Sequence, residues 1–357
     1  MAIFRKINLM PGRIATYVAS SALLIAIAAC NQGGNEKRQP DTRKSTEKAT
    51  PALSIMEMPP IDSDSAYAYV RKQVSFGPRV PNTEPHRNCA RWLTQRLNDF
   101  GASVETQKAK VTAYNGKQLN IVNIMGRYNM KAPERLLLCA HWDTRPYADR
   151  DSQNRNKPIA GANDGASGVA VLLEVARVIG NHPAQFENIG VDIVFFDAED
   201  YGKPEASMIG QSNDSWCLGS QYWCRNMPWA DYKPRFGILL DMVGAKDAVF
   251  PKEGVSMYYA PAVVNKIWSL ARQMGYGEYF VPYEGSQITD DHLYLNQLAN
   301  IPTVDIIHYE MSRLDFGAFH HTHDDNLSII DPQTLQVVGD VVLQVIGHEN
   351  QPHEQTQ

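Results

Sequence analysis

The chain has 357 residues, of which 34 are Lys or Arg and 39 are Asp or Glu, so its formal charge at pH 7 is -5. This balance excludes a strongly basic nucleic-acid-binding protein and a polyacidic tail protein, and we expect no nucleic-acid partner. Hydrophobic residues make up 43% and charged residues 20%, which excludes wholesale disorder, and five cysteines are too few for a disulfide scaffold.

The first thirty residues have the pattern of an export signal. Arg5, Lys6 and Arg13 precede an apolar stretch over residues 15–29, and small residues lead to Cys30. This ending resembles the cleavage box of bacterial lipoproteins, in which the cysteine is lipidated and becomes the new N-terminus. We therefore expect a lipoprotein signal peptide at residues 1–29 and a lipid on Cys30; a plain signal peptide cleaved after an Ala is the alternative.

The chain that follows predicts a tether, one domain and a tail. Cys30 and the polar residues up to 58 show no periodic apolar face, as in a flexible tether. Residues 59–348 have no low-complexity break and no internal repeat, which predicts a single domain, and residues 349–357 form a polar tail. The mature protein would be exported to the cell envelope and anchored to a membrane through Cys30, and Asn31 slightly favours the outer membrane.

The first part of the domain predicts two helices and two strands. Ser63 can cap a helix that runs through residue 73, and apolar residues at helical spacing predict a second helix over residues 85–100. Residues 104–111 and 119–128 alternate apolar and polar side chains, as strands with one solvated face do.

The rest of the domain alternates short apolar runs with helical patterns. The runs cover residues 136–140, 191–196, 236–240 and 301–307, and helices are predicted over residues 169–179, 260–274 and 332–346. Buried strands that alternate with helices predict an α/β fold, a mixed but mainly parallel sheet with helices on both faces. The two earlier strands are expected to pair antiparallel at one edge.

Acidic and imidazole side chains gather where the apolar runs end. The first run ends with HWD at residues 141–143, the second with DAED at residues 197–200, and the third with Asp241. Asp164 lies in the sequence GANDGASG before a helix, and residues 320–326 read HHTHDDN. Any one of these residues could be a helix cap, a turn residue or a satisfied core group. Together, at the sheet edge where α/β folds bind ligands, such carboxylates would repel one another without a cation, and histidine with carboxylate suits zinc.

These motifs, taken in order, resemble a known superfamily. AHWDTRP, GANDGASG, the acidic pair at residues 199–200, DMVGAKDAVFP, TDDH and HTHDDN are similar to the zinc-dependent M28 aminopeptidase-like superfamily, and within it to the glutaminyl-peptide cyclotransferases. The likeness begins near Phe76 and covers nearly the whole domain. It implies a zinc-exopeptidase-like fold and an acyltransferase that converts N-terminal glutaminyl residues of peptides or proteins to pyroglutamate with release of ammonia.

The resemblance also implies a role for each matched residue. It makes Asp164, Asp200 and His321 the three ligands of one zinc ion, Glu199 the acid/base carboxylate, and Asp241 and Asp290 two acids that form a hydrogen-bonded network beside the metal. Ile288 and Phe316 fall where the cyclases have apolar pocket residues. It further implies a cis peptide bond between Asp164 and Gly165.

Three positions depart from the pattern of the cyclases. The usual second ligand is a glutamate, and here it is Asp200, whose shorter arm needs a small backbone adjustment. His320 stands in the pocket where many cyclases have a tryptophan. The pocket tryptophan that follows the acidic pair could be Trp216 or Trp223, with hydrophobic packing as the alternative for each.

The chemistry that fits these residues is an intramolecular aminolysis. The α-amine of an N-terminal glutamine attacks its own side-chain amide carbon, so the substrate supplies proximity. Glu199 would take the amine proton and return it to the leaving nitrogen, and Asp290, supported by Asp241, would hold that nitrogen.

Two other functions remain open from the sequence. His141 and Asp241 could complete a second zinc site, with Asp164 as a bridge, which would make the protein a two-zinc aminopeptidase. One zinc favours the cyclase and two favour the peptidase. A lipoprotein that only binds peptides is the third possibility. Cys217 and Cys224 could pair outside the cytoplasm or remain free buried thiols.

Overall fold

The computed structural model describes residues 53–204 and 214–351, so the export signal, Cys30 and most of the predicted tether lie outside the described residues. The described chain forms the following elements in order: α1 (Ser63–Ser75), α2 (Glu84–Asp99), β1 (Ser103–Thr112), β2 (Gln118–Tyr128), β3 (Arg135–His141), α3 (Ala166–Asn181), η1 (Pro183–Phe186), β4 (Gly190–Phe196), α4 (Leu218–Arg225), β5 (Gly237–Asp241), β6 (Phe250–Lys252), α5 (Gly254–Tyr259), α6 (Pro261–Gln273), β7 (Phe280–Glu284), α7 (Asp291–Ala299), β8 (Thr303–Ile307), η2 (Leu327–Ile329) and α8 (Pro332–Glu349).

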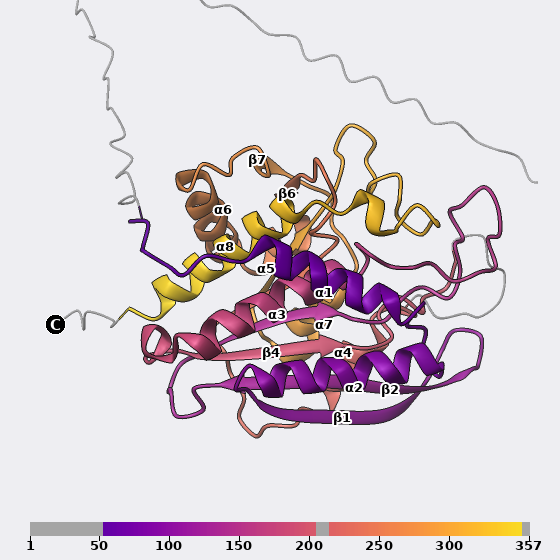
Figure 1. Ribbon diagram of the computed structural model, residues 1–357, viewed down its shortest axis with the longest axis horizontal. Helices are drawn as coiled ribbons and strands as arrows, with labels where there is room; N and C mark the ends of the chain where they lie inside the picture. The colour runs from indigo at the N-terminus through magenta and orange to yellow at the C-terminus, as the bar shows by residue number, and fades with distance from the viewer. Residues whose placement is uncertain (1–52, 205–213, 352–357) are drawn as a thin grey trace, which may run out of the picture. The chain divides into compact units, whose positions relative to one another are not determined.

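A mixed sheet in the order β1-β2-β4-β3-β5-β8 forms the centre of the fold (Figure 1). β4, β3, β5 and β8 are parallel, whereas β2 and β1 add on antiparallel at one edge. The predicted α/β architecture, including the antiparallel edge, is therefore confirmed. A separate parallel pair, β6 and β7, was not predicted.

Helices cover both faces of the sheet, because side chains alternate along each buried strand. In β3, Leu136 and Leu138 pack in the larger core cluster with residues of α1, α3 and α8. Leu137 and Cys139 point the other way, toward Trp223 of α4 and Leu295 of α7. Figure 1 shows α1, α3 and α8 side by side over one face of the sheet. Since every residue of β3 and β4 is buried, these strands read as continuous apolar runs rather than alternating ones.

The start of α3 matters most for the site. The helix begins at Ala166, earlier than predicted, and its N-cap residue is Gly165, which makes no side-chain cap. The carboxylate of Asp164 is therefore not used as a helix cap. Gly168 lets the helix approach the sheet, because a Cβ there would lie 2.1 Å from the carbonyl oxygen of Leu240. The predicted cap of α1 was wrong by one residue: Asp62, not Ser63, accepts the N–H of Ser65 at 2.9 Å.

The body extends beyond the predicted boundaries at both ends. The N–H of Met56 donates to Oε1 of Gln344 at 3.1 Å, and Leu53 and Met58 pack against the core, so residues 53–58 belong to the body rather than to the tether. At the other end α8 continues to Glu349, whose buried carboxylate pairs with Arg235 at 2.9 Å, so the predicted tail begins too early.

Two further observations concern the cysteines and the membrane. Cys89, Cys139, Cys217 and Cys224 are all buried and free, so the pairing of Cys217 with Cys224 does not form. None of the helices in residues 53–204 and 214–351 has the length and apolar composition needed to cross a bilayer.

Candidate active site

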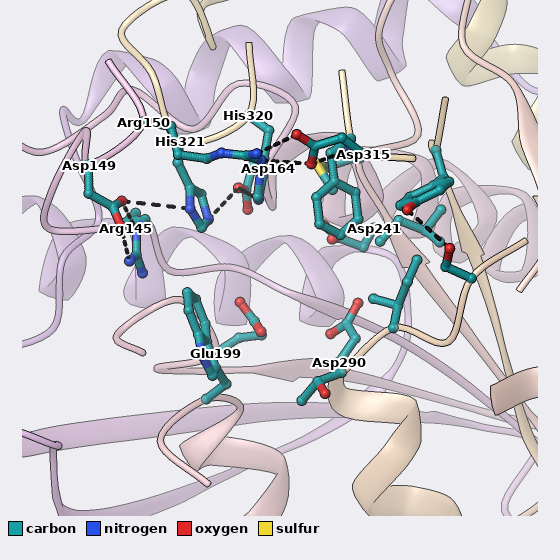
Figure 2. A pocket seen from close by; sticks show the side chains of 18 of the residues that line it. Arg145, Asp149, Arg150, Asp164, Glu199, Asp241, Asp290, Asp315, His320 and His321 are labelled. Carbon is teal, nitrogen blue, oxygen red and sulfur yellow. Dashed lines mark hydrogen bonds and ion pairs between the residues drawn. The ribbon is translucent and has the colours of Figure 1, made fainter. Parts of the chain in front are cut away.

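The parallel strands bring the predicted site residues to one edge of the sheet. His141 and Asp241 are the last residues of β3 and β5, and residues 197–200 follow β4 directly. Asp164 precedes α3, and His321 comes from the loop between β8 and α8. This edge of the sheet borders a cavity of about 630 Å³ (Figure 2), although His141 and Asp200 are not among the residues that line it. Most of the predicted site residues line it: Asp164, Glu199, Trp216, Asp241, Ile288, Asp290, Phe316, His320 and His321.

The imidazole of His321 lies close to the carboxylates of both Asp164 and Asp200. Nε2 of His321 lies 3.2 Å from Oδ1 of Asp200 and 3.7 Å from Oδ2 of Asp164. Ligands of a tetrahedral zinc ion, each about 2.0–2.2 Å from the metal, are separated by similar distances. The aspartate at position 200 therefore reaches the site despite its shorter arm. The peptide bond between Asp164 and Gly165 is cis, as the resemblance implied.

The charges of these three groups also fit a cation. Burial, and next the nearby Arg145, lower the pKa of His321 to about 3, so its ring is neutral and can offer a lone pair. Burial and the neighbouring charge of Asp164 raise the pKa of Asp200 well above its usual range. Oδ2 of Asp200 is buried without a hydrogen-bond partner. A divalent ion would relieve the repulsion and satisfy this oxygen, so the residues present fit zinc.

A second set of donors overlaps the first. Nε2 of His141 lies 3.0 Å from Oδ1 of Asp164 and 3.1 Å from Oδ1 of Asp241, and all three side chains are buried. These distances suit hydrogen bonds to a protonated imidazole and equally suit ligands of a shared ion. Asp164 belongs to both sets, as a bridging carboxylate would.

Two further acids, Glu199 and Asp290, line the cavity. Figure 2 shows them on one side of it, with His320 and His321 opposite. An oxygen of Glu199 and an oxygen of Asp290 lie within 4.8 Å of each other. Burial raises the pKa of both carboxyl groups well above the usual range, and nearby acids, Asp290 and Asp200 for Glu199 and Asp241 for Asp290, raise it further. Asp290 also caps α7, where its Oδ1 accepts the N–H of Asp291 at 2.5 Å. Within the described residues its Oδ2 is buried without a partner, so no hydrogen bond joins it to Asp241, as the implied network would require.

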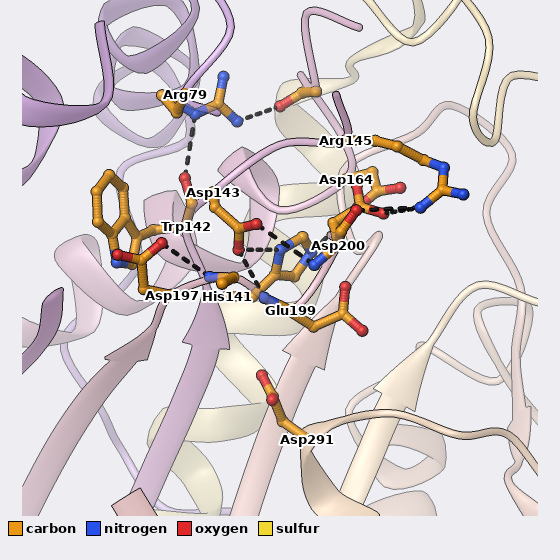
Figure 3. Close-up of polar contacts among 12 residues, drawn as sticks. Arg79, His141, Trp142, Asp143, Arg145, Asp164, Asp197, Glu199, Asp200 and Asp291 are labelled. Atoms are coloured by element: carbon orange, nitrogen blue, oxygen red, sulfur yellow. Dashed lines mark hydrogen bonds and ion pairs between the residues drawn. The ribbon is translucent and has the colours of Figure 1, made fainter. Parts of the chain in front are cut away.

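Two residues that the sequence did not assign hold the ligand segments in place. The carboxylate of Asp143 accepts the backbone N–H of Glu199 at 3.0 Å and that of Asp200 at 3.3 Å (Figure 3). Arg145 donates to the carbonyl oxygen of Asp200 at 3.0 Å and to Asp149. Both residues belong to the motif AHWDTRP, which indicated that they lie near the site but did not indicate what they bind.

Aromatic rings form one wall of the cavity. The ring of Trp216 stacks on His321 at 5.8 Å with an interplanar angle of 8°, and Phe316 packs on His320 at 4.4 Å. Ile288 belongs to a small apolar cluster with Phe316 at its edge. Trp223 lies instead in the core against Phe196, so of the two candidate tryptophans only Trp216 borders the cavity.

The fold and the strand-end cluster together define a metal-dependent enzyme of the zinc-exopeptidase type. Residues 123–346 match the model of peptidase family M28, and the chain belongs to this family. It is 49% identical to the glutaminyl cyclase of Bacteroides thetaiotaomicron, solved bound to N-acetylhistamine; the match covers 81% of this chain and 99% of that one, with a TM-score of 0.79. A Zn-dependent exopeptidase from Parabacteroides distasonis is 48% identical over the same shares of the two chains, also with a TM-score of 0.79.

A curated relative has a different activity in its name. Aminopeptidase YwaD of Bacillus subtilis is 25% identical over 279 residues, which are 75% of this chain. The chain spans 53% of the length of that relative.

Proposed function

We infer that this protein is a glutaminyl-peptide cyclotransferase, which converts the N-terminal glutaminyl residue of peptides or proteins to pyroglutamate and releases ammonia. The observation that carries this function is the pair of buried acids, Glu199 and Asp290, within 4.8 Å of each other in a cavity that also holds the histidine–carboxylate metal site. In the cyclisation, one acid can carry the proton from the attacking amine to the leaving nitrogen while the other holds that nitrogen. The similarity to a glutaminyl cyclase at 49% identity supports the same function.

The residues divide the reaction between them. The α-amine nitrogen of the substrate forms a bond to Cδ of its own glutamine side chain, and the bond from Cδ to the amide nitrogen breaks. Glu199 accepts the proton of the attacking amine and passes it to the leaving nitrogen, which departs as ammonia. Asp290 holds that nitrogen through a hydrogen bond. The wall formed by Trp216, Ile288 and Phe316 encloses the folded side chain and excludes water.

We propose that one zinc ion is held by Asp164, Asp200 and His321. When bound, zinc would polarise the γ-carbonyl of the glutamine as a Lewis acid. A second ion at His141 and Asp241 would instead support an aminopeptidase, and the overlapping donor set and the curated aminopeptidase relative favour keeping this second candidate. Metal analysis of the purified protein separates the two: one zinc per chain supports the proposal, and two contradict it.

A product assay tests the function directly. The purified protein would be incubated with a peptide that begins with Gln and with a matched peptide that begins with Leu, and products would be followed by mass spectrometry. We expect loss of ammonia from the Gln peptide and no change in the Leu peptide. A Gln peptide with an acetylated amine is the control, since its blocked nitrogen cannot attack. Release of free Leu or free Gln would establish the aminopeptidase instead.

We further propose that the protein is exported and lipid-anchored through Cys30, so that its substrates are peptides or proteins at the cell envelope. The basic, apolar and small-residue order of residues 1–30 supports this proposal. Fractionation and lipid labelling of cells that express the full chain or Cys30→Ser would test it. We expect the label and the membrane fraction to be lost in the variant, and a labelled variant would refute the anchor.

A further inference from the structure

A buried thiol contacts the carboxylate to which we assign proton transfer. Sγ of Cys217 donates to Oε1 of Glu199 at 3.2 Å, and both side chains are buried. The same sulfur lies within 4.8 Å of an oxygen of Asp290. Burial, and next the charge of Glu199, raise the pKa of the thiol well above its usual value, so the group stays protonated and acts as a donor.

The backbone fixes the direction in which this thiol points. Cys217 is the N-cap residue of α4, and its N–H donates to the carbonyl oxygen of Glu199 at 2.9 Å. The next N–H, of Leu218, donates to the carbonyl oxygen of Ala198 at 3.0 Å. The start of α4 is thus fastened to the segment that carries Glu199.

Ser220 links the start of α4 to the segment that carries Asp290. The hydroxyl oxygen of Ser220 lies 3.1 Å from the carbonyl oxygen of Cys217 and also makes a hydrogen bond with the carboxylate of Asp291, which follows Asp290 at the start of α7. The thiol is therefore held at a fixed place relative to both Glu199 and Asp290.

Arg145 and His141, the cations that the described residues place beside this segment, bind groups other than the Glu199 carboxylate. Arg145 donates to Asp149 and to the carbonyl oxygen of Asp200, and His141 lies against Asp164 and Asp241. Within the described part of the chain, Cys217 is the only residue whose side chain donates to the Glu199 carboxylate. Without that bond, the carboxylate could rotate about its own side-chain torsions beside another acid.

We propose that Cys217 is a positioning residue: its thiol holds Oε1 of Glu199 so that the second carboxylate oxygen faces the substrate amine. This inference rests on the proposed cyclisation, in which Glu199 must reach first the attacking nitrogen and then the leaving nitrogen. A neutral donor suits this place, because it orients the carboxylate without pairing its charge, which an arginine or lysine would do.

Kinetics of two variants test the proposal. Cys217→Ala should lower kcat for a Gln peptide roughly tenfold while KM stays within about twofold, since the hydrogen bond that orients Glu199 is lost but substrate contacts remain. Cys217→Ser keeps a donor and should recover most of the loss. Cys224→Ala is the matched control, because Cys224 is also buried but lies near the other end of α4 and packs in the core cluster with Trp223. An unchanged kcat in Cys217→Ala, or no recovery in Cys217→Ser, would overturn the proposal.

A vibrational measurement needs neither turnover nor a stable Cys217 variant. The S–H stretching band of a hydrogen-bonded thiol lies at lower frequency than that of a free one, and only one of the buried thiols touches Glu199. We expect a single S–H band to move to higher frequency in Glu199→Leu, while all bands stay in place in the surface variant Glu284→Leu. If no band moves, the bond is absent and the proposal fails. If the wild-type protein releases no ammonia, the proposed function fails on its own, whatever the band does.

Discussion

The buried residue Glu253 allows a quantitative test of what holds the segment of the pocket residue Ile288 in place. This buried carboxylate caps α5, and its Oε1 accepts the N–H of Val255 and the N–H of Ile288, both at 2.8 Å. Its Oε2 accepts the N–H and the hydroxyl of Ser256 at 2.6 and 2.7 Å and lies 3.0 Å from Nε2 of His292. One side chain thus joins α5 to the segment that carries the pocket residue Ile288.

The pKa of Glu253 gives the size of this effect. Burial alone would raise the pKa, but the hydrogen bond and charge of His292, with the bonds from Ser256 and Val255, outweigh it and lower the pKa from 4.5 to about 2. A difference of about 2.5 units, at about 1.36 kcal/mol each, stabilises the folded state by about 3 kcal/mol at pH 7. Because the pKa is lowered on folding, this stabilisation is complete above the unfolded pKa near 4.5 and is lost as the pH falls toward 2.

We therefore expect Glu253→Gln to lower the free energy of unfolding by about 3 kcal/mol at pH 7, because an amide cannot accept from donors on both of its ends. The difference in the free energy of unfolding between wild type and variant should shrink to about 2 kcal/mol at pH 3.5, where Glu253 of the unfolded wild type is mostly protonated. Urea unfolding at pH values from 7 to 3.5 measures this gap, and Glu284→Gln on the exposed end of β7 serves as the control. Equal stabilities at pH 7, or a gap that stays constant with pH, would refute the reasoning.

Three further outcomes follow from the site and the packing. Glu199→Gln should keep its zinc but lose about 10²–10⁴-fold in kcat, since an amide cannot carry the proton; ammonia release measures this, and normal turnover would remove Glu199 from the mechanism. His321→Ala should lose zinc on dialysis, whereas His323→Ala, whose ring pairs with Asp151 at 2.7 Å, should keep it; elemental analysis decides, and full zinc in the first variant would contradict the ligand assignment. Gly168→Ala should lower the free energy of unfolding by about 1–3 kcal/mol, because its Cβ would meet the carbonyl oxygen of Leu240, and a stability equal to that of the wild type would show that the helix can shift.

The sequence predicted the long and strongly patterned elements but missed the short ones. The four buried runs form β3, β4, β5 and β8, because a strand covered on both faces must be apolar throughout. The short helices α4, α5 and α7 and the three-residue strand β6 were not predicted. Elements of this length show too few periods to be recognised, and contacts with the rest of the fold stabilise them more than their own residues do.

The sequence predicted which strand-end residues form the candidate site, but not every contact among its residues. Residues at the ends of parallel strands must come together, so the strand order alone places His141, Glu199 and Asp241 near one another. The contact of Cys217 with Glu199 depends instead on how α4 docks after a segment that lies partly outside the described residues. No spacing in the sequence indicates that contact.

The carboxylates of the site divide into two kinds, and only the structure separates them. The two carboxylate oxygens of Asp143 accept the backbone N–H groups of Glu199 and Asp200. Those of Asp325 accept the backbone N–H groups of Asn163, at 2.7 Å, and Asp164, at 3.2 Å. These two acids hold the main chain of the ligand segments. Among residues 53–204 and 214–351, the carboxylates of Asp164 and Asp200 accept no backbone N–H group, and one oxygen of Asp200 has no partner. A buried acid whose two oxygens both accept backbone N–H groups shapes the site, whereas one that leaves an oxygen without a partner is available to a cation. Both kinds follow the same sheet edge in the sequence, so the pattern of residues predicts where the metal site lies, and the hydrogen bonds decide which acids can serve it.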